Sequence, residues 1–351
     1  MFNIKGMILG SEPMWRHTTF LAGGPADLFA VPADEEDLRL LLAAAGEAGM
    51  DIFVLGGGSN ILVADSGIRG LTIDTRLFRE YRLESRGTAA QGNGGAGDDM
   101  TAGGVAAGDD TAAGRSDSRG PAADGAADGK TAGDAAAGES LLVLGAGLSV
   151  SDAAWRSGSS GLKGLDFLFG MPGSVGGALW MNARCYDEEI ADKVAWVEVM
   201  NRAGTISRLP MRRKNWSYKH SPFQSAAGRD LIILRAAFTV SPGAPGEIKK
   251  SMREKRDDRE KKGHYRAPCA GSAFKNNRAF GAPSGVLIDN CGLKGLKIGR
   301  ASVAPWHGNI IINEGGARAS DIRGLLEKVA AEVEQSTGFR MESEILMRGG
   351  W

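Results

Sequence analysis

The sequence predicts an α+β protein with two domains, and three observations support this fold class. The chain has 351 residues, about twice the length of an average domain. Stretches with the apolar spacing of helices are mixed with short, alternating or continuously apolar stretches that are typical of strands. Little helix separates successive strands in the first half, which argues against a regular alternation of strand and helix.

The first half of the chain predicts a helix, several strands and a second helix. Residues 34–50 (DEEDLRLLLAAAGEAGM) have apolar side chains at helical spacing and acidic residues in the first turn. DIFVLG (51–56) and LTIDT (71–75) have the apolar character of buried strands. SVSDAAWRSG (149–158) predicts a short helix with Ser149 as its N-cap.

The middle of the chain predicts a hairpin, a strand and a linker. VAWVEVMNRAGTISRLP (194–210) alternates on both sides of a turn at Ala203-Gly204, as a β-hairpin does. LIILRAAFTVS (231–241) predicts a strand, and PGAPGE (242–247) predicts a linker to the C-terminal domain. We therefore expect one domain in residues 1–240 and a second in 241–351.

The C-terminal domain begins and ends with helical patterns. Residues 247–262 (EIKKSMREKRDDREKK) carry both charges at helical spacing, which favours a solvated helix face, with nucleic-acid binding as the alternative. ASDIRGLLEKVAAEVEQSTG (319–338) predicts a capped amphipathic helix with Leu325, Leu326, Val329 and Val333 on one side. FRMESEILMRG (339–349) predicts a final strand.

Residues 87–139 predict a disordered insert. Of these 53 residues, 30 are Gly or Ala. The segment therefore has too few large apolar side chains for their burial to offset the entropy lost on ordering it. The flanking stretches YRLES and LLVLGAG have strand character, so we expect the insert to extend from a hairpin. A regulatory or partner-docking arm is the alternative interpretation of this segment.

The charge balance and the cysteines exclude several classes of protein. The chain has 42 Lys plus Arg and 42 Asp plus Glu, which argues against nucleic acid as the main partner. The insert carries a charge of −6, so the remaining residues carry +6, an excess that suits anionic ligands. Cys185, Cys269 and Cys291 are far apart, which predicts neither a disulfide framework nor a metal site. Without a signal segment or a long apolar stretch, we expect a cytoplasmic protein that contacts no membrane. We also expect it to be a monomer.

Two glycine-rich stretches are candidates for a nucleotide-binding site. LGGGSNILVADSGIRG (55–70) follows a predicted strand, and FGMPGSVGGALWMNA (169–183) lies in a predicted loop. Glycine permits positive φ and lets backbone N–H groups approach phosphate oxygens closely. Neither stretch has the spacing of a Rossmann loop or a P-loop, and a single glycine cluster is as often just a tight turn. Together the two favour a dinucleotide.

The order of these motifs resembles the UDP-N-acetylenolpyruvoylglucosamine reductase (MurB) family of bacterial peptidoglycan synthesis. The resemblance covers nearly the whole chain except the insert. The matching stretches are HTTFLAGGPADLFAVP, LGGGSNILVADSGIRGLTI, GLDFLFGMPGSVGGALWMNA, SYKHSPFQ, GSAFKN, GVLIDNCGLKGLKIG, HGNIIIN and MESEILM. The chain is similar to the shorter type of the family, which lacks a tyrosine-bearing insertion after SYKHSPFQ.

The resemblance implies a fold and a reaction. It implies an FAD-binding domain of the vanillyl-alcohol-oxidase (PCMH) type, followed by an α+β domain that binds a UDP-sugar. NADPH would reduce non-covalently bound FAD, and the reduced flavin would pass hydride to the enolpyruvyl ether. A proton added at the adjacent carbon would give UDP-N-acetylmuramate.

The resemblance also implies roles for individual residues. Ser272 in GSAFKN matches the proton donor, and Glu344 in MESEILM matches the catalytic glutamate. Lys219 in SYKHS stands where the family has Arg, so it supplies the charge without the bidentate fork; Arg184 is a neighbour that could share this role. The implied substrate-binding residues are Tyr218, Lys275, Asn276 and Asn290. The implied FAD-binding residues are Gly56, Gly57, Gly58, Ser59, Asn60, Ile61, Gly170, Pro172, Gly173, Ser174, Val175, Gly176 and Gly177.

Two alternatives to this reductase stay open. A flavin oxidase of the same fold would act on an alcohol or lactone, although neither GGGSN nor GMPGSVGG contains the His or Cys that often attaches FAD covalently in such enzymes. A nucleotide-binding protein without catalysis is the second alternative, because Lys219 and Arg300 depart from the family pattern.

Overall fold

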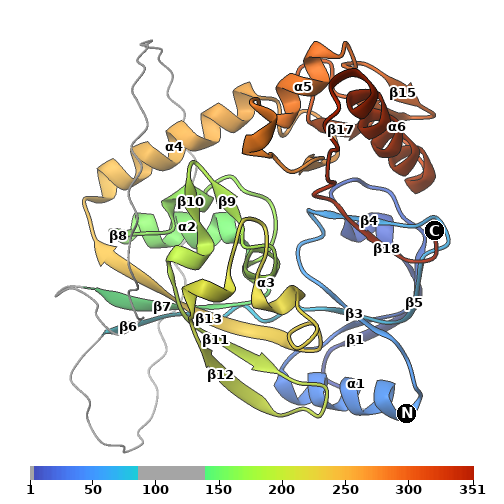
Figure 1. Ribbon diagram of the computed structural model, residues 1–351. Helices are drawn as coiled ribbons and strands as arrows, with labels where there is room; N and C mark the ends of the chain where they lie inside the picture. Colours follow the sequence, from blue (N-terminus) through green and yellow to red (C-terminus); the bar gives the residue numbers. More distant parts are fainter. Residues whose placement is uncertain (1–3, 86–138) are drawn as a thin grey trace, which may run out of the picture.

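The computed structural model describes residues 4–85 and 139–351. The predicted insert at 87–139 lies outside the described residues except for Glu139. Two sheets form the first part of the protein, and a smaller lobe (orange to red in Figure 1) forms the C-terminal part. Short 3-10 helices connect several elements: η1 Met14–His17, η2 Asp166–Leu168, η3 Ile190–Asp192, η4 Arg213–Asn215, η5 Pro222–Gln224 and η6 Arg278–Phe280.

The first sheet has four strands in the order β1-β2-β5-β3. The pair β1–β2 is antiparallel, whereas β5 is parallel to both β2 and β3. Helix α1 follows β2, and Asp34 caps it by accepting hydrogen bonds from the N–H groups of Glu36 and Asp37. The strands are β1 Met7–Pro13, β2 Pro25–Val31, β3 Ile52–Leu55 and β5 Ile68–Asp74, and the helix is α1 Glu35–Glu47.

The second sheet is antiparallel and has the order β12-β11-β13-β7-β6, with β8 also paired to β13. Strands β6 and β7 are antiparallel neighbours: Tyr81 pairs with Leu144 at one end and Ser85 with Ser140 at the other. This pairing confirms that the strands on either side of the insert are adjacent. The strands are β6 Tyr81–Ser85, β7 Ser140–Gly145, β8 Leu162–Lys163, β11 Val194–Met200, β12 Ile206–Pro210 and β13 Ile232–Pro242. The small hairpin β9 Arg184–Cys185 and β10 Glu188–Glu189 stands beside this sheet.

Helix α1 joins the two sheets, because its apolar side contacts both. Leu38, Leu41 and Leu42 pack in one cluster with Ile73 of the first sheet and Ile232 of the second. The opposite face of the second sheet packs against three helices, two that lie between its strands in the chain and one that follows its last strand. These helices are α2 Val150–Ser159, α3 Val175–Trp180 and α4 Pro245–Lys261.

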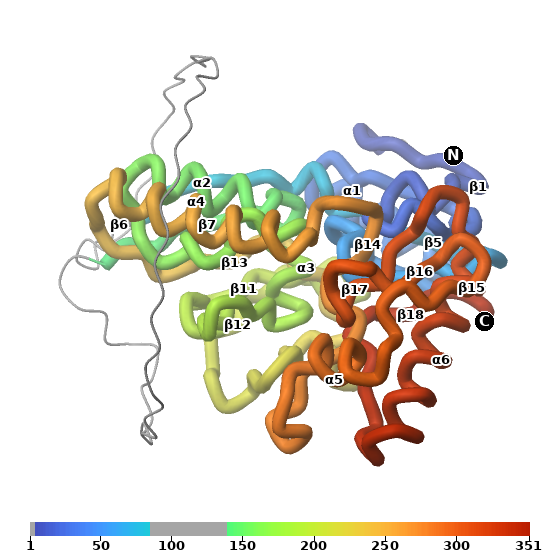
Figure 2. Tube along the Cα trace, turned by 90° about the horizontal axis from the view of Figure 1, so that it is seen from above, coloured from blue at the N-terminus to red at the C-terminus, as the bar shows by residue number. Residues whose placement is uncertain are grey.

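Helix α4 packs with the second sheet although it follows the predicted domain boundary. Ile248 and Met252 are buried in the same core as α2, and Figures 1 and 2 show α4 running alongside α2. Pro245 lies in the first turn of α4, so half of the predicted linker at 242–247 is helix, and Pro242 ends β13. The boundary at 240/241 stays a prediction, and this packing favours a boundary after α4.

The C-terminal lobe has its own core. Its antiparallel sheet, in the order β14-β17-β16-β15, packs against α6, whose side chains at Leu325, Leu326, Val329 and Val333 are all buried as predicted. The elements are β14 Cys269–Ser272, α5 Ser284–Asn290, β15 Lys297–Ile298, β16 Ala301–Val303, β17 Ile310–Asn313 and α6 Ala319–Thr337. The predicted helices at 34–50, 149–158, 247–262 and 319–338 and the predicted hairpin at 194–210 are confirmed within a few residues.

The chain returns to the first part of the protein at its end. Of the predicted strand at 339–349, only β18 (Leu346–Arg348) forms, and it pairs in parallel with β4 (Ile61–Val63). Asp65, just after β4, accepts hydrogen bonds from the N–H groups of Ala319 (2.7 Å) and Ser320 (3.0 Å) at the start of α6. These contacts fix the C-terminal lobe against the first glycine stretch, which contains β4 and Asp65.

Candidate functional site

A cavity of about 1320 Å³ lies between the two glycine stretches and the C-terminal lobe. This volume exceeds the roughly 300–1000 Å³ of ordinary small-molecule pockets, so it has room for a dinucleotide and a second ligand. We call the loop Gly56–Asn60 the first glycine loop and the loop Gly170–Ser174 the second glycine loop. Both loops contribute to the cavity wall, and Cys269–Ser272 and Glu344 face them from the C-terminal part of the chain.

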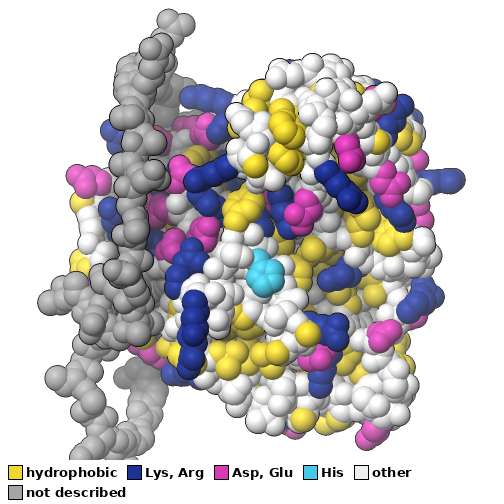
Figure 3. Space-filling model, viewed as in Figure 1, with side chains coloured by type: hydrophobic (Ala, Val, Ile, Leu, Met, Phe, Trp, Pro, Cys, Tyr) yellow, Lys and Arg dark blue, Asp and Glu magenta, His cyan; other side chains and the backbone are white. Residues whose placement is uncertain are grey.

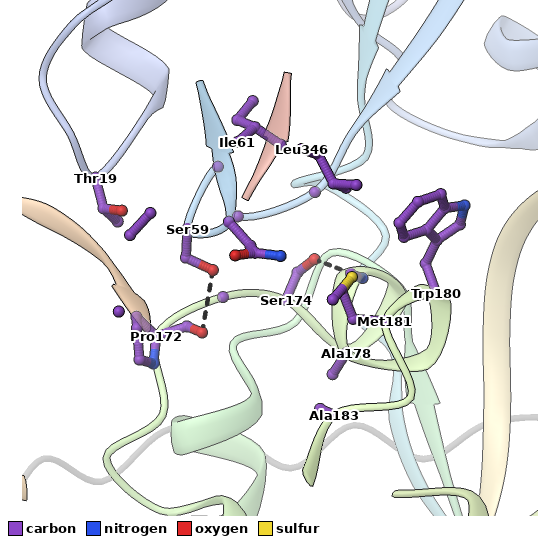
Figure 4. A pocket seen from close by; sticks show the side chains of 18 of the residues that line it. Thr19, Ser59, Ile61, Pro172, Ser174, Ala178, Trp180, Met181, Ala183 and Leu346 are labelled. Atoms are coloured by element: carbon purple, nitrogen blue, oxygen red, sulfur yellow. Dashed lines mark hydrogen bonds between the residues drawn. The ribbon is translucent and has the colours of Figure 1, made fainter. Parts of the chain in front are cut away.

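The two glycine loops touch backbone to backbone. A Cβ atom added at Gly57 would lie 2.6 Å from the Cα atom of Gly173, and Gly58 has φ +62° with the carbonyl oxygen of His17 directly behind it. Ser59 also donates a hydrogen bond from Oγ to the carbonyl oxygen of Pro172 at 3.2 Å (Figure 4). Only glycine permits this approach, which explains why both stretches are rich in this residue.

Unpaired backbone donors make the first glycine loop suitable for a phosphate. Within residues 4–85 and 139–351, no acceptor pairs with the backbone N–H groups of Gly57, Gly58 or Ser59. The buried hydroxyl of Thr19, which also lines the cavity, has no hydrogen-bond partner among the described residues. Buried polar groups ordinarily have partners, so these donors fit the pyrophosphate of a dinucleotide.

The second glycine loop leads into the short helix α3. Gly173 has φ +117°, and Ser174 caps α3 by accepting a hydrogen bond from the N–H of Gly177 at 3.2 Å (Figure 4). The close-up also shows Ala178, Trp180 and Met181 of α3 and its C-cap around the same space. The wall therefore combines backbone donors with apolar surface, as binding a flavin dinucleotide requires.

Three side chains predicted to be catalytic meet in this cavity. Lys219 Nζ lies 2.5 Å from Glu344 Oε1, and these side chains are only 14% and 12% exposed. Ser272, the last residue of β14, lines the same cavity. Lys219 has φ +56°, an unfavourable conformation for a residue with a side chain. The surrounding structure must stabilise it, as is common at functional sites.

Hydrogen bonds connect Glu344 to the first glycine loop and to the strand of Ser272. Asn60 donates from Nδ2 to the carbonyl oxygen of Glu344 at 3.0 Å, and its own carbonyl accepts from the N–H of Leu346 at 3.1 Å. The N–H of Glu344 donates to the carbonyl of Ala273 at 2.9 Å. The backbone of Glu344 is thus held from both sides of the cavity.

Most of the predicted site residues line this cavity. Those in its wall are Gly56, Gly57, Gly58, Ser59, Asn60, Ile61, Pro172, Gly173, Ser174, Gly176, Gly177, Lys219, Ser272, Asn276 and Glu344. Their roles stay predictions, because a place in the wall does not identify a ligand.

Five predicted residues lie outside the cavity wall. Val175 is buried in the core, and the carbonyl of Gly170 accepts a hydrogen bond from Tyr265 Oη at 2.5 Å. The hydroxyl of Tyr218 accepts a hydrogen bond from the N–H of Asn276 at 3.3 Å, so Tyr218 contacts a residue of the cavity wall. The other two are Lys275, which is paired with Glu342, and Asn290, which is exposed at the end of α5.

The end of α4 and the residues after it contribute side chains that the sequence did not reveal. Arg259, Lys262, His264 and Tyr265 line the cavity, and the buried Nε of Arg259 has no partner among the described residues. Burial, with smaller contributions from Arg259 and His307, lowers the pKa of His264 to about 4, so this imidazole is neutral at pH 7. The charged pattern of 247–262 concealed this group, because an exposed helix and a site-lining helix end have the same composition.

Comparisons with known proteins agree with this geometry. Residues 263–347 match the family model of the UDP-N-acetylenolpyruvoylglucosamine reductase C-terminal domain, and residues 26–101 match the model of an FAD binding domain. These matches confirm the predicted fold class, an FAD-binding domain followed by an α+β domain.

Relatives match over nearly the whole chain. The UDP-N-acetylenolpyruvoylglucosamine reductase of Treponema denticola is 35% identical over 99% of this chain and 95% of its own length. The protein of the same name from Treponema pallidum is 35% identical over 96% of this chain and 92% of its own. The crystal structure of the reductase from Thermus caldophilus has 27% identity and a TM-score of 0.70, covering 99% of this chain and 100% of that one. The chain therefore belongs to the UDP-N-acetylenolpyruvoylglucosamine reductase family.

Proposed function

We propose that this protein reduces UDP-N-acetylenolpyruvoylglucosamine to UDP-N-acetylmuramate with NADPH, through non-covalently bound FAD, in peptidoglycan synthesis. The observation that carries the proposal is the meeting of Ser272, Glu344 and Lys219 with two glycine loops in one cavity. Membership of the family and the match to an FAD-binding domain support the same reaction.

The glycine loops would hold FAD through its pyrophosphate. The free N–H groups of Gly57, Gly58 and Ser59 supply donors, and the apolar wall around α3 excludes water. FAD, when bound there, would supply hydride chemistry between NADPH and the enolpyruvyl double bond. No cysteine lies in either loop and none is needed, since the hydrogen-bonding surface suits a dinucleotide held without a covalent bond.

Ser272 would deliver the proton that completes the reduction. A serine hydroxyl is a weak acid, so the proton must be replaced as it leaves. Glu344 is suited to relaying this proton, because its backbone is anchored to Ala273, the next residue after Ser272. Its carboxylate would take a proton from water and pass it to the Ser272 oxygen. Lys219 holds the Glu344 carboxylate by direct contact and places positive charge where negative charge develops on the substrate.

The cations at the end of α4 would bind the diphosphate of the substrate. Arg259 and Lys262 line the cavity next to Tyr186 and Tyr265, and the guanidinium of Arg259 lies 5.8 Å from the ring centre of Tyr186. Cations and aromatic rings together suit a nucleoside diphosphate, with rings for the base and charges for the phosphates.

One experiment separates this function from its alternatives. The FAD-loaded protein is reduced with a single equivalent of NADPH under anaerobic conditions, and UDP-N-acetylenolpyruvoylglucosamine is then added while flavin absorbance is followed. The reductase predicts rapid reoxidation by this substrate. Flavin reduction without onward transfer would favour the nucleotide-binding protein that lacks catalysis, and oxygen consumption with an alcohol and no pyridine nucleotide would favour the oxidase.

The predicted partners and location also belong to this proposal. We propose a cytoplasmic monomer that engages neither nucleic acid nor membrane, supported by the mixture of acidic and basic side chains on the face shown in Figure 3. Among the described residues, no helix combines the length and apolar character needed to cross a bilayer. Light scattering of the purified protein tests the oligomeric state directly.

A further inference from the structure

Arg184 is a cation in the cavity wall that the proposed function does not use. It begins β9, which pairs with β10 so that Cys185 faces Glu188 and Arg184 faces Glu189. The two residues of the connecting turn, Tyr186 and Asp187, have φ +51° and +60°. Two positive φ values in a two-residue turn are typical of a tight type I′ hairpin, whose backbone is well fixed.

The guanidinium of Arg184 is oriented by two acidic side chains but keeps hydrogen-bond donors without a close partner among the described residues. Its Nη1 lies 3.3 Å from Glu189 Oε1, and its Nη2 lies 3.3 Å from Asp187 Oδ1. The Asp187 side chain is 96% exposed, so water screens that pair. Glu189 makes shorter contacts elsewhere, to Arg213 at 2.9 Å and to Asn182 at 3.0 Å. A guanidinium has five N–H donors, and two long contacts leave donors for a ligand.

The hairpin of Arg184 is joined to the loop of Lys219 by one buried side chain. Asn182, which is fully buried, donates from Nδ2 to Glu189 Oε2 at 3.0 Å and to the carbonyl of Ser217 at 2.7 Å. The guanidinium carbon of Arg184 lies 5.8 Å from the ring centre of Tyr218, the residue before Lys219. Arg184 therefore lies beside the loop that carries Lys219, in a fixed orientation.

Lys219 is already engaged by an acid. Its ammonium is 2.5 Å from Glu344 in a mostly buried pair, so it already has one carboxylate partner before substrate arrives. A substrate carboxylate in the same cavity needs another cation with free donors. Arg184 meets this requirement, because its acidic partners are either solvent-exposed or more tightly bound by other groups.

We propose that Arg184 binds the carboxylate of the enolpyruvyl group, a task separate from that of Lys219, which holds Glu344 and stabilises the charge that develops during the reaction. This inference rests on the proposed function, since it concerns the same substrate. It makes Arg184 a specificity-determining residue: the site selects a nucleotide sugar that carries a carboxylate over one that does not.

Binding measurements on the FAD-loaded Arg184→Ala variant test the proposal. Calorimetry compares UDP-N-acetylenolpyruvoylglucosamine with UDP-N-acetylglucosamine, which lacks the carboxylate. We expect the affinity for the first to fall about 10- to 100-fold, as for loss of a charged hydrogen-bonded partner, and the affinity for the second to stay unchanged. KM for the enolpyruvyl substrate should rise in parallel, while flavin reduction by NADPH keeps its rate.

Arg213→Gln is the matched control. Arg213 shares Glu189 with Arg184 and lies outside the cavity wall, so its variant perturbs the same anchor without removing a site cation. We expect both ligands to bind it as they bind the unaltered protein. Equal losses for both ligands in Arg184→Ala, no loss for either, or the same selective loss in Arg213→Gln would overturn the assignment. Failure of the unaltered protein to transfer hydride to the enolpyruvyl substrate would instead overturn the proposed function.

Discussion

The two sides of the cavity are lined by different kinds of group. The glycine loops present backbone N–H groups among mostly short side chains, and they pack so closely that a single Cβ at Gly57 would collide with Gly173. The opposite side presents Lys219, Glu344 and Ser272, whose functional atoms lie at the ends of side chains. The first side therefore depends on how closely the backbone packs, and the second on which functional groups its side chains carry.

This difference predicts different responses to substitution. A change in a glycine loop displaces backbone and removes the cofactor, which abolishes every later step. A change on the opposite side leaves the cofactor in place and stops one step of the reaction. The variants below test this contrast, beginning with the largest expected effect.

Gly57→Ala should remove FAD. The new methyl group would lie 2.6 Å from the Cα atom of Gly173, so the two loops must separate. Losing two or more hydrogen bonds to the charged pyrophosphate should weaken FAD binding about 100-fold or more. Flavin absorbance of the purified protein and titration of the apoprotein with FAD measure this effect.

Gly46→Ala is the control for Gly57→Ala. Gly46 lies in α1, where an added Cβ meets no atom within 4 Å, so alanine should raise the free energy of unfolding by up to about 1 kcal/mol. We expect this variant to retain FAD fully. Normal flavin content in Gly57→Ala would show that the contact between the loops does not shape the cofactor site.

Ser272→Ala should separate the two half-reactions. NADPH should reduce the flavin at the normal rate, because Ser272 takes no part in that step. Transfer onward to the enolpyruvyl substrate should slow by roughly 10²- to 10⁴-fold, the usual contribution of a general acid. Stopped-flow absorbance measures both steps, with Ser207→Ala on the exposed strand β12 as the control; equal slowing of both steps would contradict the assigned role.

Lys219→Met should slow onward transfer about 100-fold, the usual cost of removing one electrostatic contact at a reacting centre. It also leaves Glu344 without its partner in a mostly buried position, so the free energy of unfolding should fall by about 1–3 kcal/mol. Lys219→Arg keeps the charge and should recover most of the rate. Rapid kinetics and chemical denaturation check both effects, and an unchanged rate in Lys219→Met would exclude a catalytic role for this cation.

Asp65→Asn should have the smallest effect, a loss of about 1 kcal/mol in the free energy of unfolding at pH 7. Burial raises the pKa of Asp65, but hydrogen bonds from Ser320 and Ala319 outweigh it and hold the pKa below the ordinary value of 3.8. A carboxylate with a lowered pKa stabilises the folded state above its unfolded pKa and loses that contribution as pH falls.

The stability difference between Asp65→Asn and the unaltered protein should therefore be constant at neutral pH and shrink below about pH 4. Thermal melting across this range provides the measurement. A difference that persists at the acidic end would mean that the carboxylate charge contributes nothing to the contact with α6.

The sequence predicted the elements better than their assembly. The helix at 34–50 was predictable because acidic first-turn residues and helical spacing are local signals, and α1 follows them closely. The placement of α4 was not, because Ile248 and Met252 pack on α2, far away in the sequence. The final strand was too long in the prediction, since only Leu346–Arg348 forms a strand, while Ser343 makes an isolated bridge to Phe274.

The candidate site shows the same division. The glycine stretches were visible because close backbone packing requires a specific residue type, and Lys219, Ser272 and Glu344 were visible through their motifs. Arg259 and His264 were hidden, because their function depends on where α4 ends relative to the cavity. Asn290 was predicted to bind the substrate; it is exposed at the end of α5 and lies outside the cavity wall, so its role stays a prediction.

The short parallel pair β4–β18 has a geometric consequence for the chemistry. Strand β4 directly follows the loop that ends at Asn60, and β18 begins two residues after Glu344, so their register sets how far the carboxylate stands from the cofactor loop. A slip of one residue along this pair would carry Glu344 by about 3.3 Å. That displacement is longer than the 2.5 Å contact with Lys219 and would break it. The pairing of these three residues therefore sets the distance between Glu344 and the first glycine loop.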